Sequence, residues 1–198
     1  MLDAATLQSA LPRWCAAMQA AAPELNALDG RLGDADLGAT LDKCAAWVAQ
    51  ALPELPDDLE GIFKRCAQAS AKASGSSFGT LLTVALMTAA KHCAGRSTLA
   101  RADVAELLEA VVMALSARGG ASLGDKTVLD GLQAIQVALA AAPEQADARQ
   151  VSRQAVREAL DAFRGKPNRI GRARMFADKT IGMDDPGMVA LQRMVDAL

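Results

Sequence analysis

The chain has 198 residues, of which 52% are apolar and only 3% aromatic, and its formal net charge is −2. The apolar excess is alanine and leucine, which favour helices over strands, so we predict an all-α protein with a single domain over residues 1–198. Without a basic stripe interleaved with aromatic residues, nucleic acid is not expected as a partner. The longest strongly apolar run, 81–90, is about half of the ~20 residues that a membrane span needs, so no membrane partner is expected either.

The cysteines, the single histidine and the N-terminus limit the classes of function further. The cysteines lie inside predicted helices without a CxxC pair, so we expect buried, reduced thiols rather than disulfides or a zinc site. His92 lies in an apolar segment, where a core or helix-end role is expected, and no Ser-His-Asp site is predicted. The N-terminus lacks the basic start of a signal peptide, and we expect a cytoplasmic protein. The cysteines are Cys15, Cys44, Cys66 and Cys93.

Helical spacing of apolar residues extends along most of the chain and predicts about eight helices. Pro12 either bends the first helix or marks its true start, and Pro23 is expected in the first turn of a short second helix. The most apolar helix, 81–93, is expected at the centre of the bundle. The predicted helices cover residues 3–22, 23–28, 37–52, 58–73, 81–93, 102–118, 127–142, 144–163 and 186–198.

Four unusual loops separate these helices. Three are acidic or glycine-rich, at 29–38, 74–80 and 119–127, and the fourth, 165–187, is long and basic. Glycine loops at helix N-termini can present unpaired N–H groups to phosphate oxygens, and a basic loop could close over the same anion. A structureless loop of about twenty residues is uncommon inside a compact domain and often functional.

The acidic loop holds Asp29, Asp34 and Asp36 between glycines. Carboxylates repel one another, so a cluster this tight is stabilised by a cation, and Mg²⁺ prefers oxygen ligands and shares its shell with phosphates. Three carboxylates could hold one or two such ions. The alternative is that Asp36 caps the following helix and the other two are solvated loop residues. The residues alone leave both interpretations open.

The other loops also allow two interpretations each. Residues 74–77 could cradle a nucleotide or simply start a helix with small residues, and the chain carries no GxxxxGK[ST] or GxGxxG motif. Lys126 could reach a phosphate or pair with Asp125 or Asp130. Arg172 and the following Asp-Pro-Gly turn could bind phosphate, or form a surface loop and a helix cap.

Together, in this order and spacing, the segments resemble the DhaL (DAK2) family, the nucleotide-binding subunit or domain of dihydroxyacetone kinases. The resemblance covers nearly the whole chain. The family carries an aspartate followed by Gly-Asp-Gly-Asp-His-Gly, then Ser-Gly-x-x-aromatic-Gly-Thr, Gly-Asp-Lys-Thr, Gly-Arg-Ala and Ser-Ile-Gly-x-x-Asp-Pro-Gly. The matching segments are Asp29 with 33–38, then 74–80, 124–127, 171–173 and 180–187.

The resemblance implies an eight-helix antiparallel barrel or bundle with a nucleotide site at one end. It implies that Asp29, Asp34 and Asp36 hold two Mg²⁺ ions that bridge the phosphates of ADP or ATP. The resemblance implies a place at the nucleotide for Lys126 less strongly than for the other residues. The residues that it implies at the nucleotide are Leu37, Gly38, Ala39, Thr40, Ser74, Gly75, Ser76, Gly119, Gly120, Val128, Arg172, Asp185, Pro186 and Gly187.

Two residues depart from the family pattern. Ala35 replaces a glycine and would be strained if that position needs a positive φ. Leu37 replaces a histidine, which removes a polar group beside the expected phosphates. Neither departure changes an expected metal ligand.

The activity that the resemblance implies is phosphoryl transfer by positioning and charge neutralisation, with no catalytic side chain assigned. In the family a separate subunit or fused domain holds the small ketose, so we expect a ketose-binding kinase subunit as partner, in a homodimer or hetero-oligomer. The phosphate would come from ATP or, with ADP kept bound, from a phosphotransferase-system phosphocarrier. The alternatives are a non-catalytic ADP-binding regulatory subunit that senses the phosphotransferase state and binds a transcription factor, and a helical scaffold without nucleotide.

Overall fold

The computed structural model describes residues 1–73 and 75–198, and within them the chain forms eight α-helices. Two short 3₁₀ segments, η1 (Leu52–Glu54) and η2 (Arg172–Thr180), interrupt the connections. The only strands in these ranges, β1 (Leu2–Asp3) and β2 (Thr98–Leu99), pair antiparallel with Leu2 opposite Leu99. The all-α prediction is confirmed. The helices are α1 (Ala4–Leu32), α2 (Leu37–Ala51), α3 (Leu59–Ala71), α4 (Ser77–His92), α5 (Arg101–Gly119), α6 (Val128–Ala141), α7 (Ala148–Arg164) and α8 (Pro186–Asp196).

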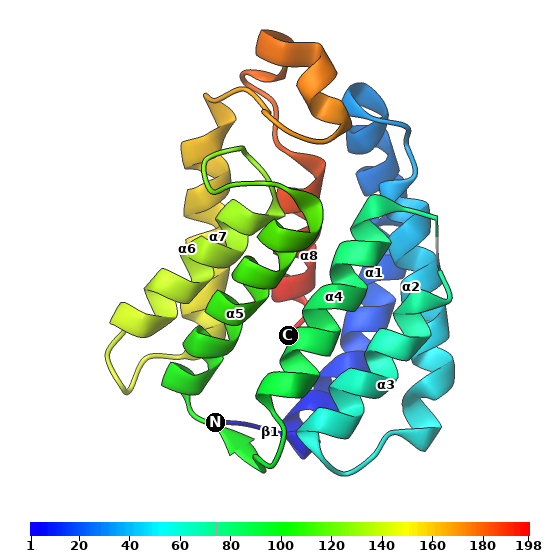
Figure 1. Cartoon of the computed structure of the whole chain (residues 1–198), viewed down its shortest axis with the longest axis vertical. Helices are drawn as coiled ribbons and strands as arrows, with labels where there is room; N and C mark the ends of the chain where they lie inside the picture. Colours follow the sequence, from blue (N-terminus) through cyan, green and yellow to red (C-terminus); the bar gives the residue numbers. More distant parts are fainter. Residues whose placement is uncertain (74) are drawn as a thin grey trace.

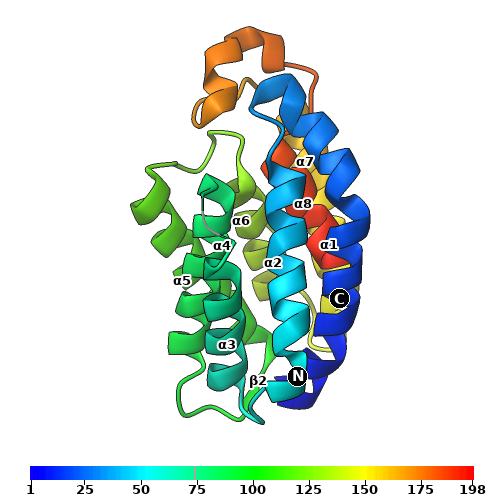
Figure 2. The same cartoon turned by 90° about the vertical axis from the view of Figure 1, so that its right-hand side faces the viewer.

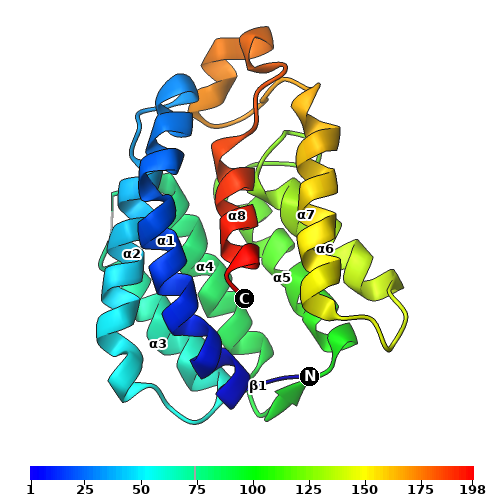
Figure 3. The same ribbon diagram turned by 180° about the vertical axis from the view of Figure 1, so that it is seen from behind.

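The eight helices close into an antiparallel ring. Each helix packs against the next one in sequence, and α8 packs back against α1 (Figure 1). Figure 3 shows α8 between α1 and α7, where it completes the ring. Because successive helices alternate in direction, α2, α4, α6 and α8 all begin at the same end of the molecule (Figure 2). The β1–β2 pair lies at the opposite end.

The first helix is longer than its prolines predict. Residues 4–32 form one continuous helix, and the predicted break between 22 and 23 is wrong. Pro12 and Pro23 both lie on the exposed side of α1, where water can bond to the carbonyls that lose their N–H partners. Asp3 caps the helix, accepting a hydrogen bond of 2.8 Å from the Thr6 amide. As a result, Asp29 lies on the last turn of a helix rather than in a loop.

Helix caps fix where the other helices begin. The Asp58 carboxylate accepts from the Gly61 amide at 2.7 Å and caps α3, and Thr127 caps α6 in a reciprocal pair with Asp130. At the start of α8, Asp185 accepts from the Met188 amide at 2.9 Å.

The ring is packed at most points but encloses an apolar cavity. Side chains from all eight helices line this space of about 1060 Å³. The α4 residues 81–88 are only partly buried, since Leu82 and Leu86 face the cavity together with Trp14 of α1. The expectation that α4 lies at the centre of the bundle is therefore wrong. The helix is one member of the ring and packs between α3 and α5. The four cysteines are buried and unbridged as predicted, and no helix in the described part of the chain is long and apolar enough to cross a membrane.

Candidate functional site

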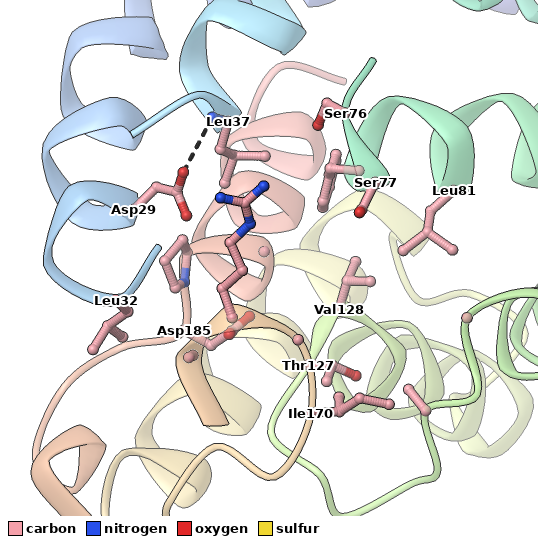
Figure 4. A pocket seen from close by; sticks show the side chains of 18 of the residues that line it. Asp29, Leu32, Leu37, Ser76, Ser77, Leu81, Thr127, Val128, Ile170 and Asp185 are labelled. Carbon is pink, nitrogen blue, oxygen red and sulfur yellow. Dashed lines mark hydrogen bonds between the residues drawn. The ribbon is translucent and has the colours of Figure 1, made fainter. Parts of the chain in front are cut away.

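Three aspartates meet at the end of the ring where α1 ends and α2 begins. Carboxylate oxygens of Asp29, Asp34 and Asp36 lie within 4.8 Å of one another. Asp29 Oδ2 accepts a hydrogen bond from the Asp36 amide at 2.9 Å. It also accepts one from the Leu37 amide at 3.3 Å (Figure 4). These bonds fold the loop back onto α1, and the convergence predicted from the sequence is present.

The loop backbone is tightly constrained around Asp29. A Cβ at Gly33 would lie 2.4 Å from Asp29 Oδ1, so only glycine fits there without moving the carboxylate. Ala35 has a φ of 61°, a left-handed conformation that costs an L-residue about 1–2 kcal/mol. The backbone strain predicted for an alanine in place of glycine is therefore present. It belongs to the loop conformation that brings the aspartates together.

The Asp36 side chain lies among the other carboxylates and does not cap its helix. Asp36 occupies the N-cap position of α2, yet its carboxylate makes no capping hydrogen bond within the described residues. Burial raises its pKa, and the neighbouring carboxylates of Asp34 and Asp29 raise it further. The helix-cap interpretation is thus not supported. Three convergent carboxylates with mutual repulsion suit a hard divalent cation such as Mg²⁺.

A pocket of about 700 Å³ opens beside the aspartates, a size typical of small-molecule sites. Each helix that begins at this end contributes residues from its start: Leu37 of α2, Ser77 of α4, Val128 of α6 and Gly187 of α8. Helix N-termini carry partial positive charge and unpaired N–H groups, so four of them around one pocket favour an anion.

The far side of the pocket is apolar. Leu81 and Leu115 line it from α4 and α5, and Ile170 lines it from the connection between α7 and α8. Figure 4 shows Leu81, Val128 and Ile170 across the pocket from Asp29 and Leu37. The pocket therefore fits a ligand with a charged, metal-binding end and an apolar end.

The predicted basic loop, residues 165–187, covers the pocket. This loop contains the 3₁₀ segment η2, which was not predicted from the sequence. Arg172 Nη1 lies 2.7 Å from Asp34 Oδ2, and the arginine side chain is 64% exposed. In Figure 1, η2 (orange) lies over this end of the ring. The segment therefore brings a guanidinium to the edge of the aspartate cluster.

The structure brings most of the predicted site residues together. Gly38, Ala39, Thr40 and Gly120 do not line the pocket, and Ser74 lies outside the described residues. Gly38 instead packs against α1, where an added Cβ would lie 2.0 Å from the Ala22 carbonyl oxygen. The predicted residues that line the pocket are Asp29, Asp34, Asp36, Leu37, Gly75, Ser76, Gly119, Val128, Arg172, Asp185, Pro186 and Gly187.

Lys126 follows neither of its predicted roles. It does not line the pocket, and its ammonium contacts backbone carbonyls rather than Asp125 or Asp130. Nearby, burial raises the pKa of Asp185 to about 6, although the Met188 amide and the Asn168 side chain donate hydrogen bonds to its carboxylate.

Sequence reasoning missed the apolar wall of the pocket. Leu81 and Leu115 have the helical spacing of core residues, and this pattern does not distinguish a pocket wall from a packed interior. Arg118 and Met175 also line the pocket and were not predicted. Only their closeness to the glycine and arginine loops in the sequence could have indicated them.

Known proteins resemble this chain in sequence over most of its length. The family model described as "DAK2 domain" matches residues 31–198, a range that includes Asp34 and Asp36 and begins just after Asp29. The dihydroxyacetone kinase of Citrobacter freundii is 30% identical over 88% of this chain, but the chain spans only 31% of that protein. The ADP-binding subunit DhaL of the PEP-dependent dihydroxyacetone kinase of Escherichia coli is 26% identical over 88% of this chain and 85% of its own length.

A solved structure has the same fold. The crystal structure of the C. freundii dihydroxyacetone kinase in complex with AMP-PNP and Mg²⁺ aligns with 98% of this chain and 33% of its own, with a TM-score of 0.76 and 25% sequence identity. Together with the family match over most of the sequence, the ring of eight helices and the aspartate cluster at its end identify this chain as a member of the DAK2 domain family.

Proposed function

We propose that the chain is the ADP- or ATP-binding subunit of a kinase for a small ketose of the dihydroxyacetone type. The observation that carries the proposal is the position of three convergent carboxylates beside a pocket lined by four helix N-termini. Clustered carboxylates bind cations, and helix N-termini bind anions. A polyphosphate with bound metal ions provides both charges. The names of the relatives support it, since the E. coli protein is an ADP-binding subunit and the C. freundii structure holds AMP-PNP and Mg²⁺.

In this proposal Asp29, Asp34 and Asp36 hold two Mg²⁺ ions, which when bound neutralise the charge that develops on the transferred phosphoryl group. The amides of Asp36 and Leu37 fix one oxygen of Asp29, so this carboxylate is oriented before a ligand arrives. The four helix starts bring the positive ends of their dipoles to the phosphates, and the apolar wall around Leu81 holds the base.

The remaining residues close the pocket. Arg172 offers a planar guanidinium suited to phosphate, and η2 covers the end of the ring and limits the access of water. The chain thus positions and neutralises the phosphates, while the acceptor sugar lies on a partner.

The partner in this proposal is a ketose-binding kinase subunit. The chain corresponds to about a third of the C. freundii kinase but to most of the E. coli DhaL subunit, which supports a role as one subunit of a larger enzyme. The phosphate comes from ATP, or from a phosphotransferase-system phosphocarrier with ADP kept bound.

Titration calorimetry with ADP tests the nucleotide site. We expect the wild-type chain to bind ADP with Mg²⁺ and much more weakly with EDTA. Asp34→Asn should weaken MgADP binding by at least about tenfold, as loss of a metal-ligand carboxylate implies. Asp178→Asn, an exposed carboxylate on η2, is the matched control and should bind as wild type. Wild-type protein that binds no MgADP, or Asp34→Asn that binds normally, would refute the site.

A reconstitution assay separates a kinase subunit from a non-catalytic regulator. The chain is mixed with a ketose-binding subunit, dihydroxyacetone and either ATP or a phosphorylated phosphocarrier, and sugar phosphate is followed by ³¹P NMR. Product that depends on this chain supports the kinase. Normal MgADP binding with no product from either donor would favour the regulator.

A further inference from the structure

A buried lysine lies beneath the pocket without lining it. Lys126 is 1% exposed, and its Nζ donates to the carbonyl oxygens of Lys166 at 2.8 Å and Thr180 at 2.9 Å, with Arg164 O at 3.5 Å. Two of these carbonyls belong to the end of α7 and the residues just after it, and the third ends η2. One ammonium therefore joins both ends of the segment 165–181, which we call the closing segment.

A second set of buried bonds holds the same segment. The Asn168 side-chain amide donates to the Lys126 carbonyl at 2.9 Å and to Asp185 Oδ1 at 2.8 Å, and the Asn168 backbone amide donates to Thr180 Oγ1 at 2.8 Å. All four of these polar residues are buried. The network runs from the start of α6, through the closing segment, to the start of α8.

This network supports three walls of the pocket. Val128 follows Lys126 by two positions, the closing segment supplies Ile170 and Arg172, and Gly187 follows the network at the start of α8. Lys126 itself contributes no atom to the pocket lining. Its bonds instead fix where these walls lie.

The arrangement carries a clear energetic cost. Burial lowers the pKa of Lys126, and the carboxylates of Asp185 and Asp184 oppose this shift. Lys126 also has a φ of 64°, which is unfavourable for a side-chain-bearing residue. An apolar residue at this position would leave the carbonyls of Lys166 and Thr180 without this donor, so the bonds of Lys126 hold the closing segment in its present position.

We propose that Lys126 is a positioning residue for nucleotide binding, which holds the closing segment, and with it Ile170 and Arg172, against the start of α6. The proposal rests on the proposed nucleotide site. The ammonium suits the task because the carbonyls at the end of a helix are partly negative and lack helical partners, and a single –NH₃⁺ can bond to three of them.

The test compares Lys126→Met, which keeps most of the side-chain volume, with Leu139→Ala. Leu139 is a buried α6 residue on the apolar cavity, far along the helix from the pocket, and its truncation lowers stability without touching the network. MgADP affinity is measured by calorimetry at a temperature at which circular dichroism shows both variants folded. Hydrogen exchange of the closing segment, residues 165–181, is measured in parallel.

We expect Lys126→Met to weaken MgADP binding by about tenfold or more, the usual effect of removing a supporting residue behind a binding group, and to speed exchange in the closing segment. Leu139→Ala should bind MgADP as wild type. If Lys126→Met also binds as wild type, or if both variants weaken binding equally, Lys126 is merely structural and the inference fails while the nucleotide site stands. If the wild type binds no MgADP, both fail.

Thr180→Val keeps the test decisive if Lys126→Met does not fold. This change removes the hydroxyl that accepts from the Asn168 amide but leaves every charge in place. The same loosening of the closing segment and weaker MgADP binding are expected, and wild-type affinity in this variant would overturn the inference.

Discussion

Arg172 Nη1 lies 2.7 Å from Asp34 Oδ2, and this contact joins the segment between α7 and α8 to the loop between α1 and α2. The two loops are far apart in the sequence and meet at the end of the ring. One side chain thus lies within reach of both the proposed metal ligands and the proposed phosphates. It links the two charged parts of the site.

Replacing Arg172 should affect binding much more than stability. The pair is exposed, so Arg172→Ala is expected to change the free energy of unfolding by no more than about 1 kcal/mol. MgADP affinity should fall by roughly tenfold, because a charge-assisted bond to a phosphate is lost. Arg169→Ala removes a neighbouring exposed arginine that does not line the pocket and should leave affinity unchanged in calorimetry. Equal losses in both variants would show a general charge effect instead.

Glycine at position 35 should stabilise the protein. Ala35 is held at a φ of 61°, and glycine removes this strain of about 1–2 kcal/mol while adding up to about 1 kcal/mol of unfolded-state entropy cost. We therefore expect Ala35→Gly to raise the free energy of unfolding slightly, with MgADP binding retained. Ala20→Gly, on the exposed face of α1, should lower it by about 1 kcal/mol. Urea unfolding of the two variants checks the opposite signs.

The close contact between α1 and α2 should make Gly38 intolerant of any side chain. An alanine Cβ there would lie 2.0 Å from the Ala22 carbonyl oxygen, and a backbone atom cannot move aside cheaply. Gly38→Ala is expected to cost about 3 kcal/mol in thermal or urea unfolding. Gly165→Ala, where nothing lies within 4 Å of the added atom, is the control and should be nearly neutral. A stable Gly38→Ala protein would contradict this packing.

Asp185 should make stability depend on pH. Its pKa is about 6 in the folded protein against an ordinary value of 3.8, because burial disfavours the charged form. The folded state therefore holds this proton more tightly, so its contribution is complete below pH 3.8 and is lost as the pH rises through 6. Between pH 4 and 7 the wild type should lose up to about 3 kcal/mol relative to Asp185→Asn.

Urea unfolding of the wild type and Asp185→Asn at several pH values measures this difference. Other titrating groups are common to both proteins and cancel in the comparison. Parallel stability curves for the two proteins would show that Asp185 does not titrate in this range.

Local chemistry made the acidic side of the site predictable. Asp29, Asp34 and Asp36 stand close together in the sequence, and a turn suffices to bring them together. The strain at Ala35 was predicted from the family pattern, which has a glycine at this position. The antiparallel ring and the wider set of site residues came from the resemblance to a family rather than from periodicity.

The sequence did not predict the contacts between residues that are far apart along the chain. Pro23 predicted a helix start, but its exposed place on α1 lets the helix continue. Lys126 has carboxylates beside it in the sequence, yet its partners are carbonyls of residues near 166 and 180. The wall around Leu81 shows the spacing of an ordinary core helix. The continuous α1 helix, the partners of Lys126 and the wall around Leu81 all depend on residues that are distant in the sequence. The spacing of residues along the chain does not show which distant residues come into contact.

The unbroken α1 helix spans the molecule from one cavity to the other. Leu7 and Trp14 near its beginning line the apolar cavity, and Asp29 on its last turn belongs to the polar pocket. At 1.5 Å per residue, its 29 residues extend over roughly 43 Å. The position of the Asp29 carboxylate is therefore set by a helix whose other end packs around the apolar cavity.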